Sequence, residues 1–159
     1  MMNKKQGLPW DHPRFRSWIA VARACQMMQQ QLTRALAGLD IKPPHLDILV
    51  NLYRFEGISQ QELARKLLVG RSNMSMLLPQ MEARGLIERR SDERDRRVWR
   101  LYLTVAGREL AEQAMAIQTA LIEDTLSATP LDQCMAMADT MERIVGRLLE
   151  QERAEAGDH

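Results

Sequence analysis

Residues 86–103 are the part of this chain that most limits what it can fold into. Two short segments, Leu86–Arg90 and Val98–Leu103, flank a loop, Ser91–Arg97, that is almost entirely charged. The returning segment alternates between apolar and polar side chains, which is typical of a β-strand. We therefore expect a β-hairpin that is too short to be a domain. Packing does not require so many arginines in its loop, whereas a polyanionic partner could use them.

The remainder of the chain has apolar residues at three- and four-residue steps, as amphipathic helices do. Proline, glycine and capping residues mark where these helices begin and end. The expected helices lie at residues 11–39, from Pro43-Pro44 to Gly57, after the capping box Ser59–Glu62, at Arg71–Arg84, after Thr104, and after Thr129-Pro130. The predicted fold class is therefore mainly α with a small β-wing.

The centre of this pattern, residues 43–104, has the element order of a winged helix-turn-helix. Helical regions at residues 11–39 and 105–152 flank it, and we expect one compact domain overall. The outer helices are too long and too one-sided to bury their apolar stripes against so small a centre. The stripes therefore predict a partner, most simply a second copy of the chain, with the flanking regions as dimerisation helices.

Charge is distributed unevenly along a chain whose net charge is only +1. Residues 1–100 carry 18 Lys and Arg against 10 Asp and Glu, whereas residues 101–159 carry 4 against 11. A basic body followed by an acidic section fits a protein that presents one face to phosphates and keeps the other away from them.

Several kinds of chemistry find no support in the sequence. There is no Gly-rich phosphate loop, no metal-ligand spacing and no nucleophile motif, so we expect no enzyme, no catalytic residue, no cofactor and no metal. Cys25 and Cys134 lie far apart and match no redox spacing. Without a signal peptide or a run of about 20 apolar residues, the predicted location is the cytoplasm, with no membrane partner.

The helix at Arg71–Arg84 is predicted to have two distinct faces at about 100° per residue. Its core face is apolar and consists of Met74, Leu77, Leu78 and Met81. Its opposite face holds Ser72, Met76, Pro79 and Gln80. Small polar groups at the start of a helix suit the major groove of DNA. The predicted base- and phosphate-contacting residues are Arg71, Ser72, Asn73, Ser75 and Met76. The alternative is an ordinary solvated helix face.

Pro79 lies well inside this helix, where a proline removes one backbone hydrogen bond and clashes with the preceding turn. Either the helix is kinked there, or its regular part begins later than Arg71. The choice affects which side chains can reach DNA.

Three motifs lie in the hairpin and on either side of it. The most specific is Asp92-x-Arg94-Asp95-x-Arg97; Glu82-x-x-Gly85-Leu86-Ile87-x-Arg89 precedes it, and Leu103-Thr104-x-x-Gly107 follows it. Together they make residues 46–110 resemble the MarR family of bacterial transcription regulators. The resemblance implies a homodimer of winged helix-turn-helix subunits, in which the first and last helices interleave and Arg71–Arg84 is the recognition helix.

The resemblance also implies roles in the loop. By position, Arg94 resembles a wing-tip arginine that enters the minor groove, and Asp92 and Arg97 resemble a pair that holds the wing in shape. The family often has a polar or basic residue at the position of Met76 and seldom a proline at that of Pro79. An operator sequence therefore cannot be transferred.

The charged loop also has a simpler interpretation. Its acidic side chains could pair with its arginines as a solvated cluster that contributes little to stability. The same carboxylates could instead fix the arginine rotamers for DNA. We predict that the hairpin contacts DNA through Asp92, Arg94, Arg96 and Arg97.

Relatives in this family often bind a small effector, such as an aromatic acid or a phenol, and the effector predicted here is an aromatic acid or a thioester. The candidate residues here are His12, Arg16, Trp18 and His45. Arg16, close to aromatic residues, could hold a carboxylate. The simpler interpretation favours Trp18 as a core residue and His45 as a local helix cap.

Cys25 offers a redox alternative, because some relatives sense peroxides through a cysteine in the first helix. It falls within the apolar stripe, which favours a buried, inert thiol. A winged-helix adaptor that binds proteins is a further alternative. The favoured prediction is a dimeric cytoplasmic regulator, most simply a repressor. It would bind a pseudo-palindromic site with half-sites about 34–36 Å apart and be released by an effector.

Overall fold

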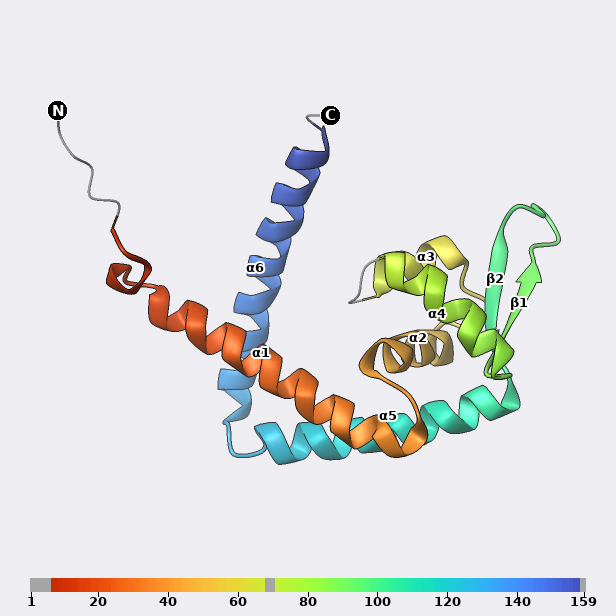
Figure 1. The fold of residues 1–159 in the computed structure, drawn as a ribbon, viewed down its shortest axis with the longest axis horizontal. Helices are drawn as coiled ribbons and strands as arrows, with labels where there is room; N and C mark the ends of the chain where they lie inside the picture. Colours follow the sequence, from red (N-terminus) through yellow and green to blue (C-terminus); the bar gives the residue numbers. More distant parts are fainter. Residues whose placement is uncertain (1–6, 68–70, 158–159) are drawn as a thin grey trace. The chain divides into compact units, whose positions relative to one another are not determined.

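The computed structural model describes residues 7–67 and 71–157 of the 159-residue chain. The elements follow the predicted order of four helices, a hairpin and two helices (Figure 1). They are η1 Pro9–Asp11, α1 Phe15–Leu36, η2 Ala37–Leu39, α2 Pro43–Arg54, α3 Gln60–Lys66, α4 Arg71–Ala83, β1 Ile87–Ser91, β2 Trp99–Leu103, α5 Val105–Leu126 and α6 Leu131–Gly157. The chain divides into two compact units, residues up to Thr119 and residues from Ala120.

The helix starts are fixed by local hydrogen bonds that the sequence indicates. The Ser59 hydroxyl accepts from the Glu62 amide at 3.1 Å, and the Glu62 carboxylate accepts from the Ser59 amide at 3.0 Å. This capping box starts α3 at the predicted place. Between α4 and β1 the chain turns at Gly85, whose φ of +71° favours glycine.

The hairpin is antiparallel, with Ile87 opposite Leu103 and Arg89 opposite Leu101. Ile87, Leu101 and Leu103 are buried, whereas the side chains between them are exposed or half-buried. The segment before α3 extends the pairing, because the Leu101 amide donates to the Ile58 carbonyl at 3.0 Å. The hairpin is therefore joined to the helical part through both its backbone and its apolar face.

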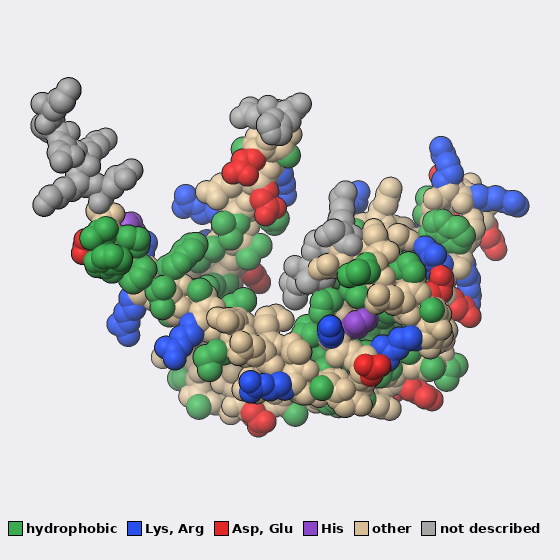
Figure 2. Space-filling model, in the orientation of Figure 1, with side chains coloured by type: hydrophobic (Ala, Val, Ile, Leu, Met, Phe, Trp, Pro, Cys, Tyr) green, Lys and Arg blue, Asp and Glu red, His purple; other side chains and the backbone are tan. Residues whose placement is uncertain are grey.

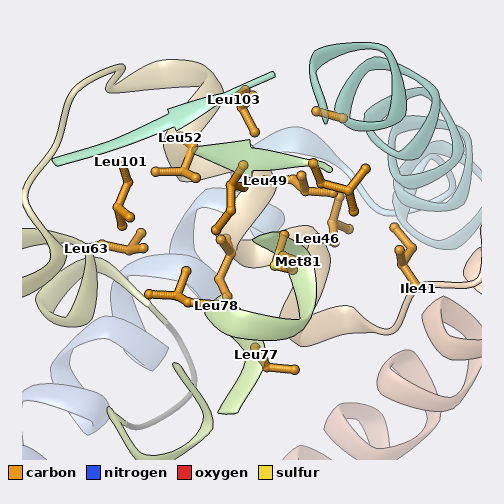
Figure 3. Close-up of a cluster of buried hydrophobic side chains, with 14 of the residues drawn as sticks. Ile41, Leu46, Leu49, Leu52, Leu63, Leu77, Leu78, Met81, Leu101 and Leu103 are labelled. Atoms are coloured by element: carbon orange, nitrogen blue, oxygen red, sulfur yellow. The ribbon is translucent and has the colours of Figure 1, made fainter. Parts of the chain in front are cut away.

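The first unit has one core, to which the hairpin and α2 to α5 all contribute (Figure 3). Leu77, Leu78 and Met81 of α4 face this core, and each is less than a tenth exposed. They belong to the same core as leucines of α2 and β2. Those labelled in Figure 3 are Leu46, Leu49, Leu52, Leu101 and Leu103. Burial of such side chains stabilises a fold by about 1.5–3 kcal/mol each. The orientation of α4 relative to the hairpin is thus set by shared packing.

Pro79 lies inside α4, and the helix is assigned without a break from Arg71 to Ala83. The expectation that its regular part begins after Arg71 is therefore wrong. The proline occupies an exposed position, where its ring does not disturb the core.

Two residues of α1 that were predicted to be buried are exposed in the single chain, so these predictions are wrong for it. Trp18 is 73% exposed, and Cys25 is exposed and free. Along α1, only Leu36 is buried, and α6 has no buried residue among those described. Both helices carry apolar stripes, but apart from the C-terminal end of α1, where Leu36 is buried, most of their large side chains are exposed.

Within the described ranges, no helix combines the length and the apolar character needed to cross a membrane.

Candidate nucleic-acid interface

The outer face of α4 is the first component of the candidate site. Met76 is 58% exposed, and Ser75, Pro79 and Gln80 are exposed as well. Asn73 is half-buried. The inner face is buried as predicted, so the helix has the two faces that its periodicity indicates. The side chains of Arg71 and Ser72, at its first two positions, lie outside the described part of the chain.

The tip of the hairpin is the second component. Arg94, Arg96 and Arg97 are all exposed, and Figure 2 shows several Lys and Arg side chains around the tip. The Arg97 guanidinium lies 3.1 Å from the Asp95 carboxylate, but its side chain is 91% exposed. Such a solvated pair contributes little to stability. No described carboxylate lies within ion-pair distance of the Arg94 or Arg96 guanidinium.

Asp92 organises the hairpin loop through both of its carboxylate oxygens. Oδ1 accepts a hydrogen bond from the Arg94 amide at 2.9 Å. Oδ2 lies 2.9 Å from a terminal nitrogen of Arg100. The bond from the Arg94 amide, followed by the one from Arg100, lowers the pKa of Asp92 below its ordinary value. Asp92 is therefore a charged anchor for the turn that presents Arg94.

Arg100 is a residue that sequence reasoning missed. Besides its pair with Asp92, it donates to the Gly57 carbonyl at 3.0 Å and so connects the loop to the segment before α3. Asp92 holds the hairpin loop, as the resemblance implied, whereas Arg97 bonds to Asp95 and Arg100 is the partner of Asp92. The alternation of β2 marks Arg100 as polar but gives no sign of a partner eight residues away.

A second ion pair joins the hairpin to α4. The Arg89 guanidinium makes two bonds to the Glu82 carboxylate, at 3.0 and 3.2 Å. Both side chains are about one third exposed. A two-bond pair of this kind fixes direction as well as distance. It explains the spacing of Glu82 and Arg89 in the motif that precedes the loop.

The motif that follows the hairpin closes its base. The Thr104 hydroxyl donates to the Gly85 carbonyl at 2.6 Å and accepts from the Gly107 amide at 3.0 Å, which caps α5. Gly107 is buried, and a Cβ atom there would overlap the Leu86 carbonyl oxygen. The start of α5 is thus held tightly against the turn between α4 and β1.

These elements enclose a concave surface. A cavity of about 500 Å³ opens between α3, α4 and β2, and its lining includes Arg65, Ser75 and Arg97. Arginines from α3 and from the hairpin loop therefore lie beside Ser75 in the N-terminal half of α4. An arrangement with cations at the rim and a helix face beside them suits a groove bounded by phosphates.

The predicted effector residues do not form one site. His12 and Trp18 line an open hollow of about 340 Å³, and neither Arg16 nor His45 lies in its lining. His45 accepts a hydrogen bond from the Lys42 amide at 3.0 Å, which confirms the local cap. Burial of His45, followed by the nearby charge of Arg84, lowers its pKa below 6.5.

Metal binding finds no support in the described part of the chain, where no three His, Cys, Asp or Glu side chains gather in a way that could hold an ion.

Comparison with known proteins places this arrangement in a family. The chain matches the model described as "MarR family" over residues 39–98. It is 30% identical over 137 residues to the transcriptional repressor MprA of Escherichia coli, a match that covers 82% of this chain and 76% of MprA. This chain belongs to the MarR family. Its resemblance to that family, inferred from the three motifs, is confirmed.

Two further proteins extend the comparison. An uncharacterised HTH-type transcriptional regulator of Bacillus subtilis, YdgJ, is 26% identical over 104 residues; the match covers 65% of this chain and 63% of that protein's length. The repressor CouR, solved with a 23-mer DNA duplex, superimposes with a TM-score of 0.73 at 26% identity, over 90% of this chain and 99% of CouR. CouR of Rhodococcus jostii has also been solved with p-coumaroyl-CoA (TM-score 0.73, 25% identity, 87% and 95% covered).

Proposed function

We propose that this chain is a MarR-type transcriptional repressor that binds double-stranded DNA through the outer face of α4 and the tip of the hairpin. The observation that carries the proposal is the joint fixing of these two surfaces. They share one core, and the Glu82–Arg89 and Asp92–Arg100 pairs hold the hairpin to the helices. The DNA-bound structure of CouR and the name of MprA support the same function.

The proposed contacts divide by chemistry. The N-terminal residues of α4 would enter the major groove, with Asn73, Ser75 and Met76 near base edges and Arg71 and Ser72 near phosphates. The hairpin would follow the neighbouring backbone, with Arg94 in the minor groove and Arg96 and Arg97 at phosphates. Asp92 would act through the loop it holds.

The repressor is proposed to be a homodimer. Large apolar side chains of α1 and α6 are exposed in the single chain, and these stripes would be covered by a second copy. They include Trp18, Ile19, Val21, Met27, Met28, Leu131, Met135, Val145, Leu148 and Leu149. A two-fold dimer would bind a pseudo-palindromic operator whose half-sites lie about 34–36 Å apart.

Release from DNA is proposed to follow binding of an aromatic acid or its thioester, since CouR has been solved with p-coumaroyl-CoA. The effector would favour a dimer in which the two α4 helices have a separation unsuited to the operator. The proposal places the protein in the cytoplasm and gives it no enzymatic reaction.

The test is recovery of a binding site. The full chain would be incubated with a library of random duplexes, and the bound fraction would be amplified and sequenced over several rounds. We expect a pseudo-palindrome that binds at least about 1,000-fold more tightly than an unrelated duplex, as specific DNA-binding proteins do. A bound pool without a shared sequence, displaced equally by heparin and by any duplex, would contradict the proposal.

A further inference from the structure

The outer face of α4 carries an apolar strip formed by two exposed side chains. Met76 is 58% exposed, and Pro79, three residues later, is also exposed. Residues three apart are neighbours on a helix surface, so the thioether and the pyrrolidine ring lie side by side. The core residues of α4 are on the other face, so this strip is not the edge of the core.

Folding gives no reason for the strip. Proline is the least favourable residue in a helix interior, and Pro79 cannot donate the hydrogen bond that the Ser75 carbonyl would otherwise receive. The position is exposed, and so are its polar neighbours Ser75 and Gln80. Because Pro79 destabilises the helix and lies outside the core, we infer that it and Met76 contact something outside the chain.

The surroundings restrict what that contact can be. Ser75, the residue before Met76, lines the cavity together with Arg65 and Arg97, so cations lie beside this part of α4. The complementary surface needs negative charge at its rim and small apolar groups inside. The major groove of DNA has this arrangement, with phosphates at its edges and the methyl groups of thymine on its floor.

Neither side chain of the strip can read a base through a strong hydrogen bond. The Met76 thioether is only a weak acceptor, and the ring of Pro79 has no donor. An apolar contact is what they offer, and thymine alone among the four bases presents a methyl group for it. The unbranched methionine can adapt its rotamer to the position of that group.

We propose that Met76 and Pro79 contact thymine C5-methyl groups in each half-site and so make the chain select A·T pairs there. The inference rests on the proposed function, since it requires α4 to enter the major groove.

The experiment removes the methyl group alone. In the selected operator, each thymine would be replaced in turn by uracil, which differs from thymine only in lacking the C5-methyl group. Affinities would be measured for the wild type, for Met76→Gln, which has a similar length but a polar end, and for Met76→Leu, which stays apolar. Gln80→Ala is the comparison on the same face, because it removes a polar neighbour of Met76 and leaves both apolar side chains in place.

For the wild type, uracil at one or two positions of each half-site is expected to weaken binding about fourfold, the effect of exposing one methyl-sized group. In Met76→Gln, thymine and uracil should bind equally at the position that Met76 contacts. In Met76→Leu and Gln80→Ala the penalty should persist. Pro79→Ala, with a shorter reach, should reduce the penalty at the neighbouring position.

Two results would overturn the inference. One is a uracil scan in which no position changes the affinity of the wild type. The other is a uracil penalty that stays the same in Met76→Gln and Pro79→Ala, both shown by circular dichroism to be folded. Either result leaves the proposed function standing, because the operator is still bound. Failure to select any operator would overturn both.

Discussion

At the residue scale, the conformation of the hairpin loop depends on two bonds made by the Asp92 carboxylate. Asp92 bonds to the Arg94 amide and to Arg100, and Arg100 also bonds to the Gly57 carbonyl. The loop that carries Arg94 is therefore fixed through Asp92 and Arg100, whereas the Arg97 side chain is exposed. A pattern in sequence shows which residues are charged, but only the path of the loop decides that Asp92 meets Arg100.

Replacement of Arg100 by glutamine should weaken operator binding about tenfold, the effect of losing one charge-assisted hydrogen bond in the loop. The salt dependence of binding should stay unchanged, since Arg100 positions the loop and releases no counterion. Arg97→Gln is the comparison, and its slope of log affinity against log salt should fall by about one. Equal changes of slope in the two variants would show that Arg100 itself contacts phosphate.

His45 gives a second prediction at this scale, on the pH dependence of stability. The pKa of His45 is below 6.5 in the folded chain, because burial and Arg84 disfavour its charged form. As pH falls below 6.5, the unfolded chain takes up a proton that the folded chain does not, so the free energy of unfolding decreases. Above that pH the stability is fully present.

The variant that isolates this effect is His45→Gln. Glutamine at this helix position can accept the same hydrogen bond from the Lys42 amide without titrating. Denaturant unfolding at pH 7.5 and 5.5 should show a smaller loss of stability in the variant than in the wild type. The account of His45 is contradicted if both lose the same amount.

At the element scale, periodicity predicts most of what is observed. The two faces of α4 and the alternation of β2 follow from residue spacing, because each is set by packing on a single element. Interactions between elements are harder to predict from the sequence. The Glu82–Arg89 pair appears in the sequence only within a family motif. Thr104 is correctly predicted as a helix cap, but its bond to the Gly85 carbonyl depends on the turn that brings α4, β1 and α5 together.

The tight start of α5 is testable through Gly107. Alanine there would place a methyl group against the Leu86 carbonyl oxygen, so α5 or the turn must shift. We expect the free energy of unfolding to fall by about 1–3 kcal/mol, as for other overpacked sites. Gly146→Ala, where nothing lies within 4 Å of the added atom, is the control and should not destabilise the chain. Equal stability of Gly107→Ala and the wild type in urea unfolding would contradict this packing.

At the scale of the whole molecule, the single chain leaves large apolar side chains of α1 and α6 exposed. The apolar stripes of α1 and α6 are predicted correctly, but Trp18 and Cys25 are exposed where burial was expected. Spacing shows that a helix has an apolar face, yet it does not show whether the same chain covers that face. For the same reason, the effector residues chosen from sequence do not come together in one subunit.

Dimerisation should depend on the apolar stripe of α6. Leu149 lies on this stripe and is 45% exposed, whereas Gln151 is on the opposite side at about 100° per residue. Leu149→Glu should shift the chain from dimer to monomer in sedimentation velocity at micromolar concentration, because a charge would be buried at the interface. Gln151→Glu adds the same charge and should remain a dimer. A dimeric Leu149→Glu variant would exclude this face of α6 from the interface.

The hairpin arginines and α4 are proposed to bind DNA together, and a salt titration of operator binding with Arg94→Ala tests this. Arg94 is exposed at the tip, and no described carboxylate pairs with its side chain. Removing it should weaken binding and lower the slope of log affinity against log salt by about one. Arg153→Ala, which removes the same charge near the end of α6, should change neither. Unchanged affinity and slope in Arg94→Ala would contradict the account.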